Sequence, residues 1–249
     1  MTIARKSDEE IEQIAAAGCV LVETLECLAL EVRPGAVPAD LDRIAEDFIR
    51  SRGAVPSCKG YRGYPASICV SPNALAVHGI PGPRALEEGD IVTLDLAVTK
   101  DGWVADAART YAVGEVDNGA RRLIDTAEAA LRAGAEQCRA GHRLGDISEA
   151  IQRTTEGAGF SVLRALRGHG VGRELHEEPL IANFGEAGTG VLLEPGMVLA
   201  IEPMIGTGGT GTYIARDGWG VFSEDGSLTA HSEWTVAVGS EGGRILTPW

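Results

Sequence analysis

Apolar residues recur at the three- and four-residue spacing of an amphipathic helix in four parts of the chain. Ser7-Asp8-Glu9-Glu10 places a capping serine three residues before a glutamate, an arrangement that often begins a helix. Glycines follow the later periodic segments, as expected where helices stop. The predicted helices run from Ser7 to about Glu31, from Asp40 to near Gly53, from Asp117 or Asn118 toward Arg139, and from Asp146 to the glycines Gly157 and Gly159.

Short runs rich in apolar and β-branched residues lie between and after these helices and predict strands. No Pro- or Ser-rich linker and no block of like charge divides the sequence. We therefore expect residues 1–249 to form a single domain of the α/β (α+β) class. The predicted strands are Ile91–Val98, Trp103–Val113, Val198–Ile205 and Thr235–Val238.

The sequence contains a weak internal repeat. Gly35–Leu41 aligns with Gly141–Ile147 at an offset of 106 residues, and Leu86–Asp95 aligns with Leu193–Glu202 at an offset of 107. A helix start and a glycine turn before a strand are common units that also recur by chance. Here, however, each aligned strand ends in a carboxylate six residues after its glycine. We therefore expect two halves, about 1–115 and 116–249, related by a pseudo-twofold axis.

Charge and cysteine content exclude several classes of function. The formal net charge of −14 repels nucleic acid and anionic lipid but tolerates cations. The five cysteines are scattered and form no C-x-x-C pair, which argues against a disulfide framework and a thiolate zinc site. The N-terminus lacks the apolar segment of a secretory signal, and no apolar stretch approaches the ~20 residues of a membrane span. A cytoplasmic protein is expected.

Two aspartates occupy strands that are otherwise apolar. Asp95 lies inside Ile91–Val98, although aspartate is depleted in strands and an isolated buried carboxylate is unfavourable. Lys100-Asp101-Gly102 is a turn signal, and folding the chain around Lys100 and Asp101 places Asp95 opposite Asp106. Two opposed carboxylates repel each other, so on a half-buried hairpin they need a cation. The alternative is a strand face open to water.

Glu202 and Glu233 repeat this anomaly, in Leu199–Met204 and His231–Val236. His169 is flanked by glycines that leave its imidazole unobstructed, and histidine is a common metal ligand. Four carboxylates with one imidazole carry too much negative charge for one divalent ion. They suit two ions of the Mn, Fe or Co type, and they do not suit a structural zinc.

Other chemistry finds little support in the sequence. His176-Glu177-Glu178-Pro179-Leu180 lacks the second histidine of an H-E-x-x-H zinc helix. No G-x-S-x-G nucleophile motif is present, and no cysteine lies near a histidine in the chain, so a nucleophilic side chain is unsupported. His142 and His231 lie outside the motifs considered below and were assigned no role.

The order and local contexts of Asp95, Asp106, His169, Glu202 and Glu233 resemble those of the type I methionine aminopeptidases. The resemblance covers nearly the whole chain and implies the pita-bread fold, in which two pseudo-symmetric halves surround a curved antiparallel sheet flanked by helices. The segments that carry it are Val77-His78-Gly79-Ile80-Pro81, Gly168-His169-Gly170-Val171-Gly172, His176-Glu177-Glu178-Pro179, Ile201-Glu202-Pro203-Met204 and Asp217-Gly218-Trp219.

This resemblance implies a role for each matched residue. The five residues named above would hold two divalent ions, which are Mn, Fe, Co or Zn. Glu202 would also act as the general base, His176 would stabilise the oxyanion, and His78 would contact the scissile amide and help to protonate the leaving amine. A monovalent cation near Asn73 and Thr229 is a further expectation. The methionine side chain would be bound by Cys58, Tyr61, Tyr64, Leu175 and Trp219, where aromatic and sulfur surfaces suit a thioether.

The implied activity is hydrolysis of the N-terminal methionine from nascent polypeptides, at the ribosome and by a monomer, with a preference for a small second residue. The alternatives are an X-Pro aminopeptidase or prolidase on the same fold and an inactive pita-bread protein that binds peptides. The chain departs from the family pattern at several positions near the site, and these leave pocket tightness and metal preference open. The departures are Arg62, Ala74, Val77, Ala107 and Leu175.

Overall fold

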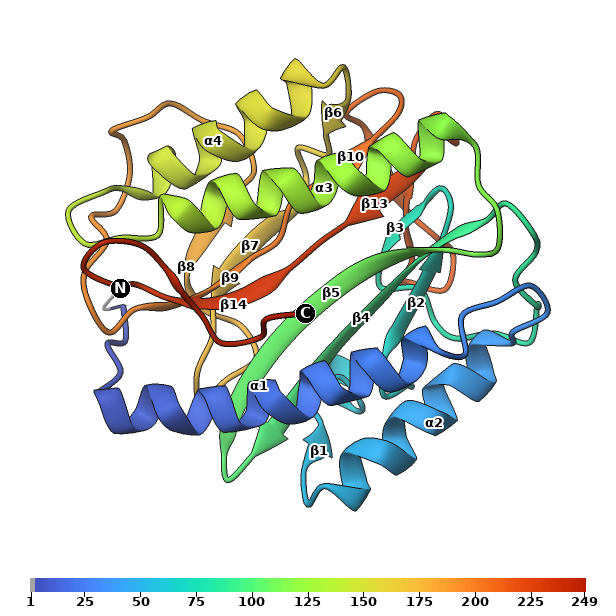
Figure 1. Cartoon of the computed structure of the whole chain (residues 1–249), viewed down its shortest axis with the longest axis horizontal. Helices are drawn as coiled ribbons and strands as arrows, with labels where there is room; N and C mark the ends of the chain where they lie inside the picture. The colour runs from blue at the N-terminus through green and yellow to red at the C-terminus, as the bar shows by residue number, and fades with distance from the viewer. Residues whose placement is uncertain (1–2) are drawn as a thin grey trace.

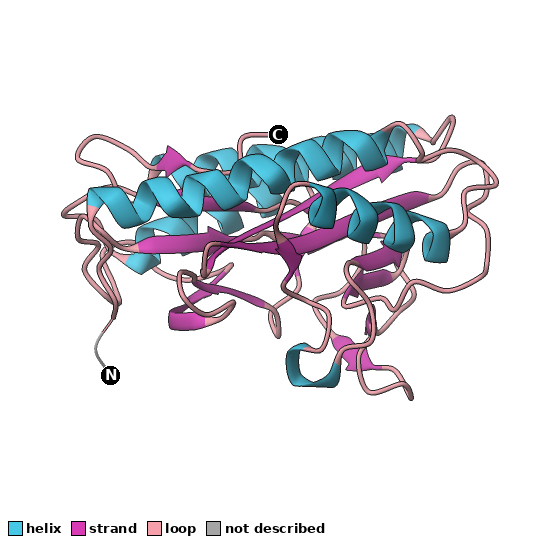
Figure 2. Cartoon of the chain, turned by 90° about the horizontal axis from the view of Figure 1, so that it is seen from below, coloured by secondary structure: helices cyan, strands magenta, loops and turns pink. Residues whose placement is uncertain are grey.

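The computed structural model describes residues 3–249, and within them the four predicted helices are confirmed. They lie along one side of the strands, as Figures 1 and 2 show. No helix among these residues is long and apolar enough to cross a membrane. The helices are α1 (Asp8–Ala29), α2 (Pro38–Ser51), α3 (Asn118–Glu136) and α4 (Leu144–Gly157), and a short 3₁₀ turn, η1, covers Tyr61–Gly63.

The cap of α1 is as predicted, because Ser7 and Glu10 form the reciprocal capping box. The predicted starts of α2 and α4 were each about two residues too late. Asp40 and Asp146 occupy the third helical position rather than the cap, where a carboxylate still favours the positive end of the helix dipole. In α2 the first position belongs to Pro38, whose fixed φ suits a helix start.

The strands pair only in antiparallel fashion wherever they form ladders among residues 3–249, and four sheets result. The first half of the chain gives β1 (Val55–Pro56), β2 (Cys69–Pro72), β3 (Leu75–Val77), β4 (Ile91–Lys100) and β5 (Trp103–Ala112). The second half gives β6 (Ser161–Val162), β7 (Arg167–Gly170), β8 (Glu177–Ala182), β9 (Val198–Ile201), β10 (Met204–Gly206), β11 (Thr212–Ile214), β12 (Val221–Ser223), β13 (Thr229–His231), β14 (Trp234–Ala237) and β15 (Arg244–Ile245).

Two of these sheets frame the centre of the molecule. One joins β1, β4 and β2, with β5 on the other edge of β4, and the other has the order β15-β14-β9-β7-β8. The smaller sheets are β13-β10-β6 and β11-β12-β3. The predicted strand Val198–Ile205 is divided into β9 and β10 at Glu202-Pro203, because proline lacks the N–H that would continue the ladder.

The register of the β4–β5 hairpin differs from the prediction. Lys100 pairs with Trp103, so the loop is Asp101-Gly102, and both loop residues have positive φ (49° and 76°), as a two-residue hairpin turn requires. Asp95 therefore faces Ala108 rather than Asp106, so the predicted direct opposition was wrong. The shift is two residues, which keeps side chains on the same face. Asp95 and Asp106 are diagonal neighbours on one face of the sheet.

The two central sheets meet along a seam between β5 and the segment 229–237. The backbone N–H of Glu233 donates to the carbonyl of Ala108 at 2.8 Å. On one side of that bond the hydroxyl of Thr110 bridges the backbone N–H and C=O of His231 (2.9 Å each). This seam brings together residues that lie at least 121 positions apart in the sequence.

Equivalent backbone contacts recur in the two parts of the chain that the sequence repeat aligns. The N–H of Gly35 donates to the carbonyl of Leu86 at 2.7 Å, and the N–H of Gly141 donates to that of Leu193 at 3.1 Å. Each contact ties the segment before a helix, α2 or α4, to the segment before a strand, β4 or β9. These contacts support our proposal that the single domain consists of two halves related by a pseudo-twofold axis.

The core lies between the helices and the central sheets. The first hydrophobic cluster joins α1 and α2 to β4 and β5, and the second joins α3 and α4 to β9 and β14. Fully buried leucines and isoleucines fill both clusters, for example Leu21, Leu25, Leu96 and Ile151. The helices thus cover one face of the strands and leave the carboxylate-bearing positions on the other.

Candidate metal centre and active site

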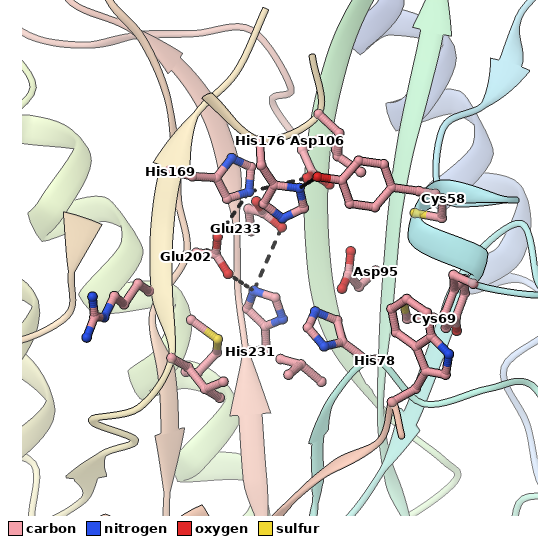
Figure 3. Close-up of a pocket in the computed structure, with 18 of the residues that line it drawn as sticks. Cys58, Cys69, His78, Asp95, Asp106, His169, His176, Glu202, His231 and Glu233 are labelled. Atoms are coloured by element: carbon pink, nitrogen blue, oxygen red, sulfur yellow. Dashed lines mark hydrogen bonds and ion pairs between the residues drawn. The ribbon is translucent and has the colours of Figure 1, made fainter. Parts of the chain in front are cut away.

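A single pocket with a volume of about 200 Å³ collects nearly all of the predicted site residues. This volume is smaller than that of pockets for drug-sized ligands and suits one amino-acid side chain. The five predicted metal ligands, His78, His176 and the five predicted methionine-binding residues all line it, whereas Asn73 and Thr229 do not. Figure 3 shows the carboxylates and imidazoles pointing toward one another in its centre.

Three potential metal-ligand atoms come together in the pocket. Asp106 on β5, His169 on β7 and Glu233 between β13 and β14 each offer one atom, and these atoms lie within 4.8 Å of one another. All three residues are buried, and Asp106, the most exposed of them, is only 6% exposed. Buried carboxylates that converge without a positive partner are typical of a metal site.

The environment of His169 fixes which nitrogen is available as a ligand. Its Nδ1 lies 2.9 Å from the carbonyl oxygen of Gly170, so the ring donates its proton there. Its Nε2 lies 3.4 Å from Glu202 and 3.7 Å from Asp106. Burial lowers the pKa of His169, so the ring is neutral at neutral pH. A lone pair that faces two carboxylates is stable only with a cation between them.

Several buried acceptors of this cluster lack a partner. Within residues 3–249, Oδ1 of Asp106 and Oε1 of Glu233 accept no hydrogen bond. Burial raises the pKa of Asp106, Glu202 and Glu233 well above the usual range, and repulsion from neighbouring carboxylates, Asp95 among them, raises these pKa values further. A divalent ion would satisfy these oxygens and offset the repulsion, so the residues present fit a metal.

Asp95 and Glu202 complete the predicted set from the two equivalent strands. Burial raises the pKa of Asp95 to about 7, although its neighbour Cys69 lowers it slightly. Glu202 follows directly after β9, and Glu233 precedes β14, the strand with which β9 pairs. Figure 3 places Asp95 across the pocket from Glu202 and Glu233.

His231 belongs to the site, although the sequence analysis gave it no role. Only 2% of it is exposed, and its Nε2 lies 3.8 Å from both Glu202 and Glu233. Neither ring nitrogen has a hydrogen-bond partner in the part of the chain described. Burial and the nearby histidines His78 and His169 lower its pKa to about 3. Its spacing of two residues from Glu233, which sets both on one strand face, was the signal that could have found it.

His176 stands at the mouth of the pocket and is held by Tyr61. The Tyr61 hydroxyl lies 3.0 Å from Nδ1 of His176, and the two rings stack with centroids 5.2 Å apart. The second face of His176 approaches His169 at 4.2 Å between centroids. Desolvation against the pocket wall, and then His169 and Arg62, lower the pKa of His176. The imidazole is therefore neutral.

His78 reaches the pocket from an unusual backbone conformation. Its φ is 59°, a left-handed value that non-glycine residues rarely adopt outside functional sites. Gly79 follows it, and a Cβ there would meet the carbonyl oxygen of Val70 at 2.2 Å. The close approach of the two backbone segments thus turns the His78 side chain toward the pocket. Desolvation lowers its pKa.

The methionine-binding residues form an apolar wall, which is made of Cys58, Tyr61, Tyr64, Leu175 and Trp219. The Tyr64 hydroxyl donates to the carbonyl of Gly79 at 2.9 Å, and its ring packs in a T-shaped arrangement with Trp219, with centroids 5.1 Å apart. The carboxylate of Asp217 accepts a hydrogen bond from the backbone N–H of Trp219 at 2.8 Å. This bond fixes the turn that carries the indole.

Asn73 and Thr229 contact each other beside the pocket. Thr229 donates both its hydroxyl and its N–H to the carbonyl of Asn73, at 2.8 and 2.9 Å. The Asn73 side chain is bonded to Asp90 and to the N–H of Ile91. The monovalent cation near these residues stays a prediction.

Four of the five departures from the family pattern fall into two groups. Arg62, Val77 and Leu175 line the pocket and therefore shape it directly. Ala107 points the other way, into the hydrophobic cluster shared with α1, because it lies between Asp106 and Ala108 on the opposite face of β5. This departure therefore affects the core and not the lining of the pocket.

Comparison with known proteins identifies close relatives of the whole chain. The model of metallopeptidase family M24 matches residues 9–237. A methionine aminopeptidase from Clostridium perfringens is 47% identical over 98% of this chain and 98% of its own. The crystal structure of methionine aminopeptidase from Rickettsia prowazekii superimposes with a TM-score of 0.98 at 40% identity, covering 99% of this chain and 100% of that one.

A prolidase from Pyrococcus furiosus has the same fold at lower similarity. Its TM-score is 0.79 at 23% identity, and the match covers 98% of this chain but 65% of that one. At this identity the likeness speaks for the fold alone. The aminopeptidases named above, by contrast, match this chain over nearly the whole length of both chains.

Proposed function

Because this chain belongs to metallopeptidase family M24, we propose that it removes the N-terminal methionine of polypeptides with two divalent metal ions. The ions are held by Asp95, Asp106, His169, Glu202 and Glu233. The observation that carries this proposal is the buried convergence of Asp106, His169 and Glu233, whose ligand atoms face one another without a positive partner among residues 3–249.

The donor set indicates the kind of metal. Carboxylate oxygens and imidazole nitrogen suit Mn, Fe, Co or catalytic Zn, and no thiolate is needed. When bound, divalent ions in such a site acidify a water molecule and polarise the scissile carbonyl. His231 adds a second neutral imidazole beside Glu202 and Glu233 and keeps these carboxylates in a dry environment.

Three residues of the chain move or hold protons in the proposed reaction. Glu202 accepts the proton of the attacking water, a role that its position in the pocket beside the other ligands allows. His176 donates a hydrogen bond to the developing oxyanion. Because the Tyr61 hydroxyl can donate to Nδ1 of His176, the proton of the neutral ring is left on Nε2, where it can serve as that donor. His78 contacts the scissile amide and protonates the leaving amine.

The apolar wall selects the side chain of the first residue. Aromatic faces and the two pocket cysteines match the polarisable thioether of methionine. The small volume of the pocket leaves little room for a second large side chain, so a small second residue is preferred. We propose that the substrates are nascent chains in the cytoplasm, emerging from ribosomes, and that the enzyme acts as a monomer without nucleic acid or membrane contacts.

The test is release of free amino acid from defined peptides by chelator-treated protein supplied with Mn, Fe, Co or Zn. Methionine release from Met-Gly-Met-Met is the expected outcome, and the order of the ions identifies the cofactor. Release from Ala-Pro peptides with silence on Met-Gly-Met-Met would instead show an X-Pro peptidase. Tight metal binding without hydrolysis of any peptide would show a binding protein.

A further inference from the structure

A buried ion pair joins the N-terminal segment to the active-site region. Nζ of Lys6 lies 2.7 Å from Oε2 of Glu177, and only 5% and 15% of the two side chains are exposed. Lys6 is the one lysine that is buried among residues 3–249. Exposed ion pairs contribute little to folding stability, but a buried charge that loses its partner is strongly destabilising. The two side chains are therefore expected to stay paired and to fix the local structure.

The other oxygen of Glu177 organises the loop between β7 and β8. Oε1 accepts the backbone N–H groups of Arg173 at 2.8 Å and of Glu174 at 3.2 Å. We call residues 171–176 the His176 loop. Its conformation is held by these two hydrogen bonds to one carboxylate. This loop connects His169 on β7 to His176 and presents both Leu175 and His176 to the pocket.

Glycine at position 172 leaves the space that the ion pair occupies. A Cβ at Gly172 would lie 2.5 Å from Cε of Lys6 and 2.7 Å from Oε1 of Glu177. The far side of the loop is held by the N–H of Val104, which donates to the carbonyl of Gly172 at 2.8 Å. The N–H of Lys6 in turn donates to the carbonyl of Gly196 at 2.7 Å, which anchors the N-terminal segment.

We propose that Lys6 is a positioning residue for the reaction. It fixes the carboxylate of Glu177, and the carboxylate fixes the His176 loop, so that the His176 imidazole is held ready for the oxyanion. The inference rests on the proposed function of His176. Lys6 itself contacts no substrate, and its effect on turnover passes through the loop.

The experiment compares Lys6→Met with Lys100→Met in the full-length enzyme with Mn. Lys100 is a suitable control because its Nζ donates to the carbonyl of Arg52 and neither residue lines the pocket. Lys6→Met is expected to lower kcat by up to about 100-fold, the loss that follows a displacement of ~1 Å at a catalytic group. Its KM for methionyl peptides should change less. Lys6→Arg restores the charge and should recover most of kcat.

Two further readouts separate positioning from a general loss of structure. Amide hydrogen exchange should accelerate in residues 171–176 of Lys6→Met, while α1 keeps its protection. In a His176→Ala background, Lys6→Met should lower kcat no further, because the group it positions is gone. The exchange measurement needs no turnover, so it remains informative even if wild-type protein releases no methionine and the proposed function fails.

The proposal is overturned if Lys6→Met retains wild-type kcat and exchange in the His176 loop. It is equally overturned if Lys6→Met lowers kcat as much in the His176→Ala background as in the wild type. Should Lys6→Met not fold, Glu177→Gln takes its place, since it removes the charge but keeps an acceptor for Arg173 and Glu174. The same two outcomes then decide.

Discussion

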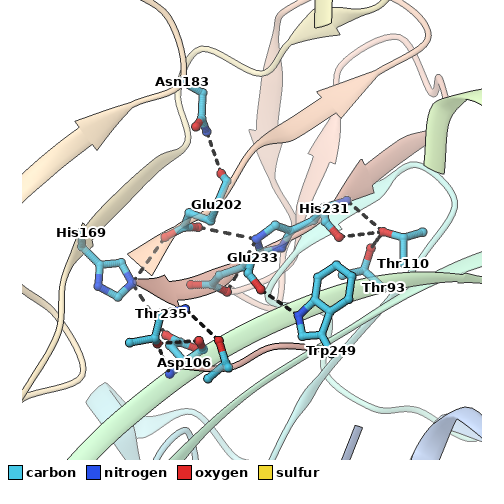
Figure 4. Close-up of polar contacts among 11 residues, drawn as sticks. Thr93, Asp106, Thr110, His169, Asn183, Glu202, His231, Glu233, Thr235 and Trp249 are labelled. Carbon is cyan, nitrogen blue, oxygen red and sulfur yellow. Dashed lines mark hydrogen bonds and ion pairs between the residues drawn. The ribbon is translucent and has the colours of Figure 1, made fainter. Parts of the chain in front are cut away.

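The hydroxyl of Thr235 forms hydrogen bonds with both the backbone N–H and the backbone C=O of Asp106. Its Oγ1 accepts the N–H of Asp106 at 2.9 Å and donates to the carbonyl of Asp106 at 2.7 Å, as Figure 4 shows. Thr110 makes the same pair of bonds with His231 on the other side of the seam. Two threonines thus hold the backbones of two pocket residues in matching ways. A strand of each half positions a residue that belongs to the other half.

We predict that Thr235→Val destabilises the protein by about 1–3 kcal/mol, because the buried N–H and C=O of Asp106 lose their partner. Metal affinity should fall as well, since β5 is no longer fixed against β14. Thr154→Val is the control, because the Thr154 hydroxyl bonds only to Ala150 in the same helix. Denaturant unfolding and metal titration check the prediction. Equal effects of the two substitutions would contradict it.

Removal of metal should make stability fall as pH rises above neutrality. The folded-state pKa of Asp106, Glu202 and Glu233 is raised, so the metal-free folded protein keeps protons that the unfolded chain releases. Stability from these groups is lost between the usual carboxyl range and the raised values. From about pH 7 to about pH 8 the histidines are mostly deprotonated in both states, so they mask little of this loss.

The measurement is the melting temperature of chelator-treated protein across that interval, with and without Mn. We expect it to decline without metal and to remain nearly level with metal, so that stabilisation by metal is largest at the higher pH. Asp106→Asn removes one of the coupled acids and should flatten the decline. A metal-free protein that becomes more stable from about pH 7 to about pH 8 would refute this interpretation of the carboxylate cluster.

Tyr61→Phe tests whether the Tyr61 hydroxyl orients His176. The phenyl ring preserves the apolar wall, so KM should change little. Loss of one hydrogen bond to Nδ1 should lower kcat by about 3- to 10-fold. Tyr213→Phe on the exposed strand β11 is the matched control. Steady-state kinetics on a methionyl peptide decide, and an unchanged kcat in Tyr61→Phe would show that the hydroxyl has no such role.

Much of this architecture follows from patterns within short segments. The capping box at Ser7 and Glu10 predicts the start of α1, and an aspartate inside an apolar strand marks Asp95 as exceptional. These features are local, since each depends on residues within one turn or one strand. The confirmed helices and the grouping of the candidate ligands in one pocket rest on such signals together with the family resemblance.

The features that escaped prediction depend on contacts between distant segments. The hairpin register depends on whether the two-residue loop includes Lys100 or Gly102. Both registers keep Asp95 and Asp106 on one face of the sheet. The ion pair between Lys6 and Glu177 joins residues 171 positions apart, and no local pattern marks it. For His231 the spacing from Glu233 was a local signal, but its place beside Glu202 depends on the seam along β5.

The most direct test of the account is methionine release by chelator-treated wild-type protein and by Asp106→Ala, each measured with and without added Mn. Asp106 contributes to the cluster that should hold the metal, and circular dichroism verifies that both proteins are folded. We predict that Mn restores wild-type activity and that Asp106→Ala remains inactive at every Mn concentration. Full activity of the wild type without metal, or of Asp106→Ala with metal, would contradict the assignment of a metal-dependent aminopeptidase site.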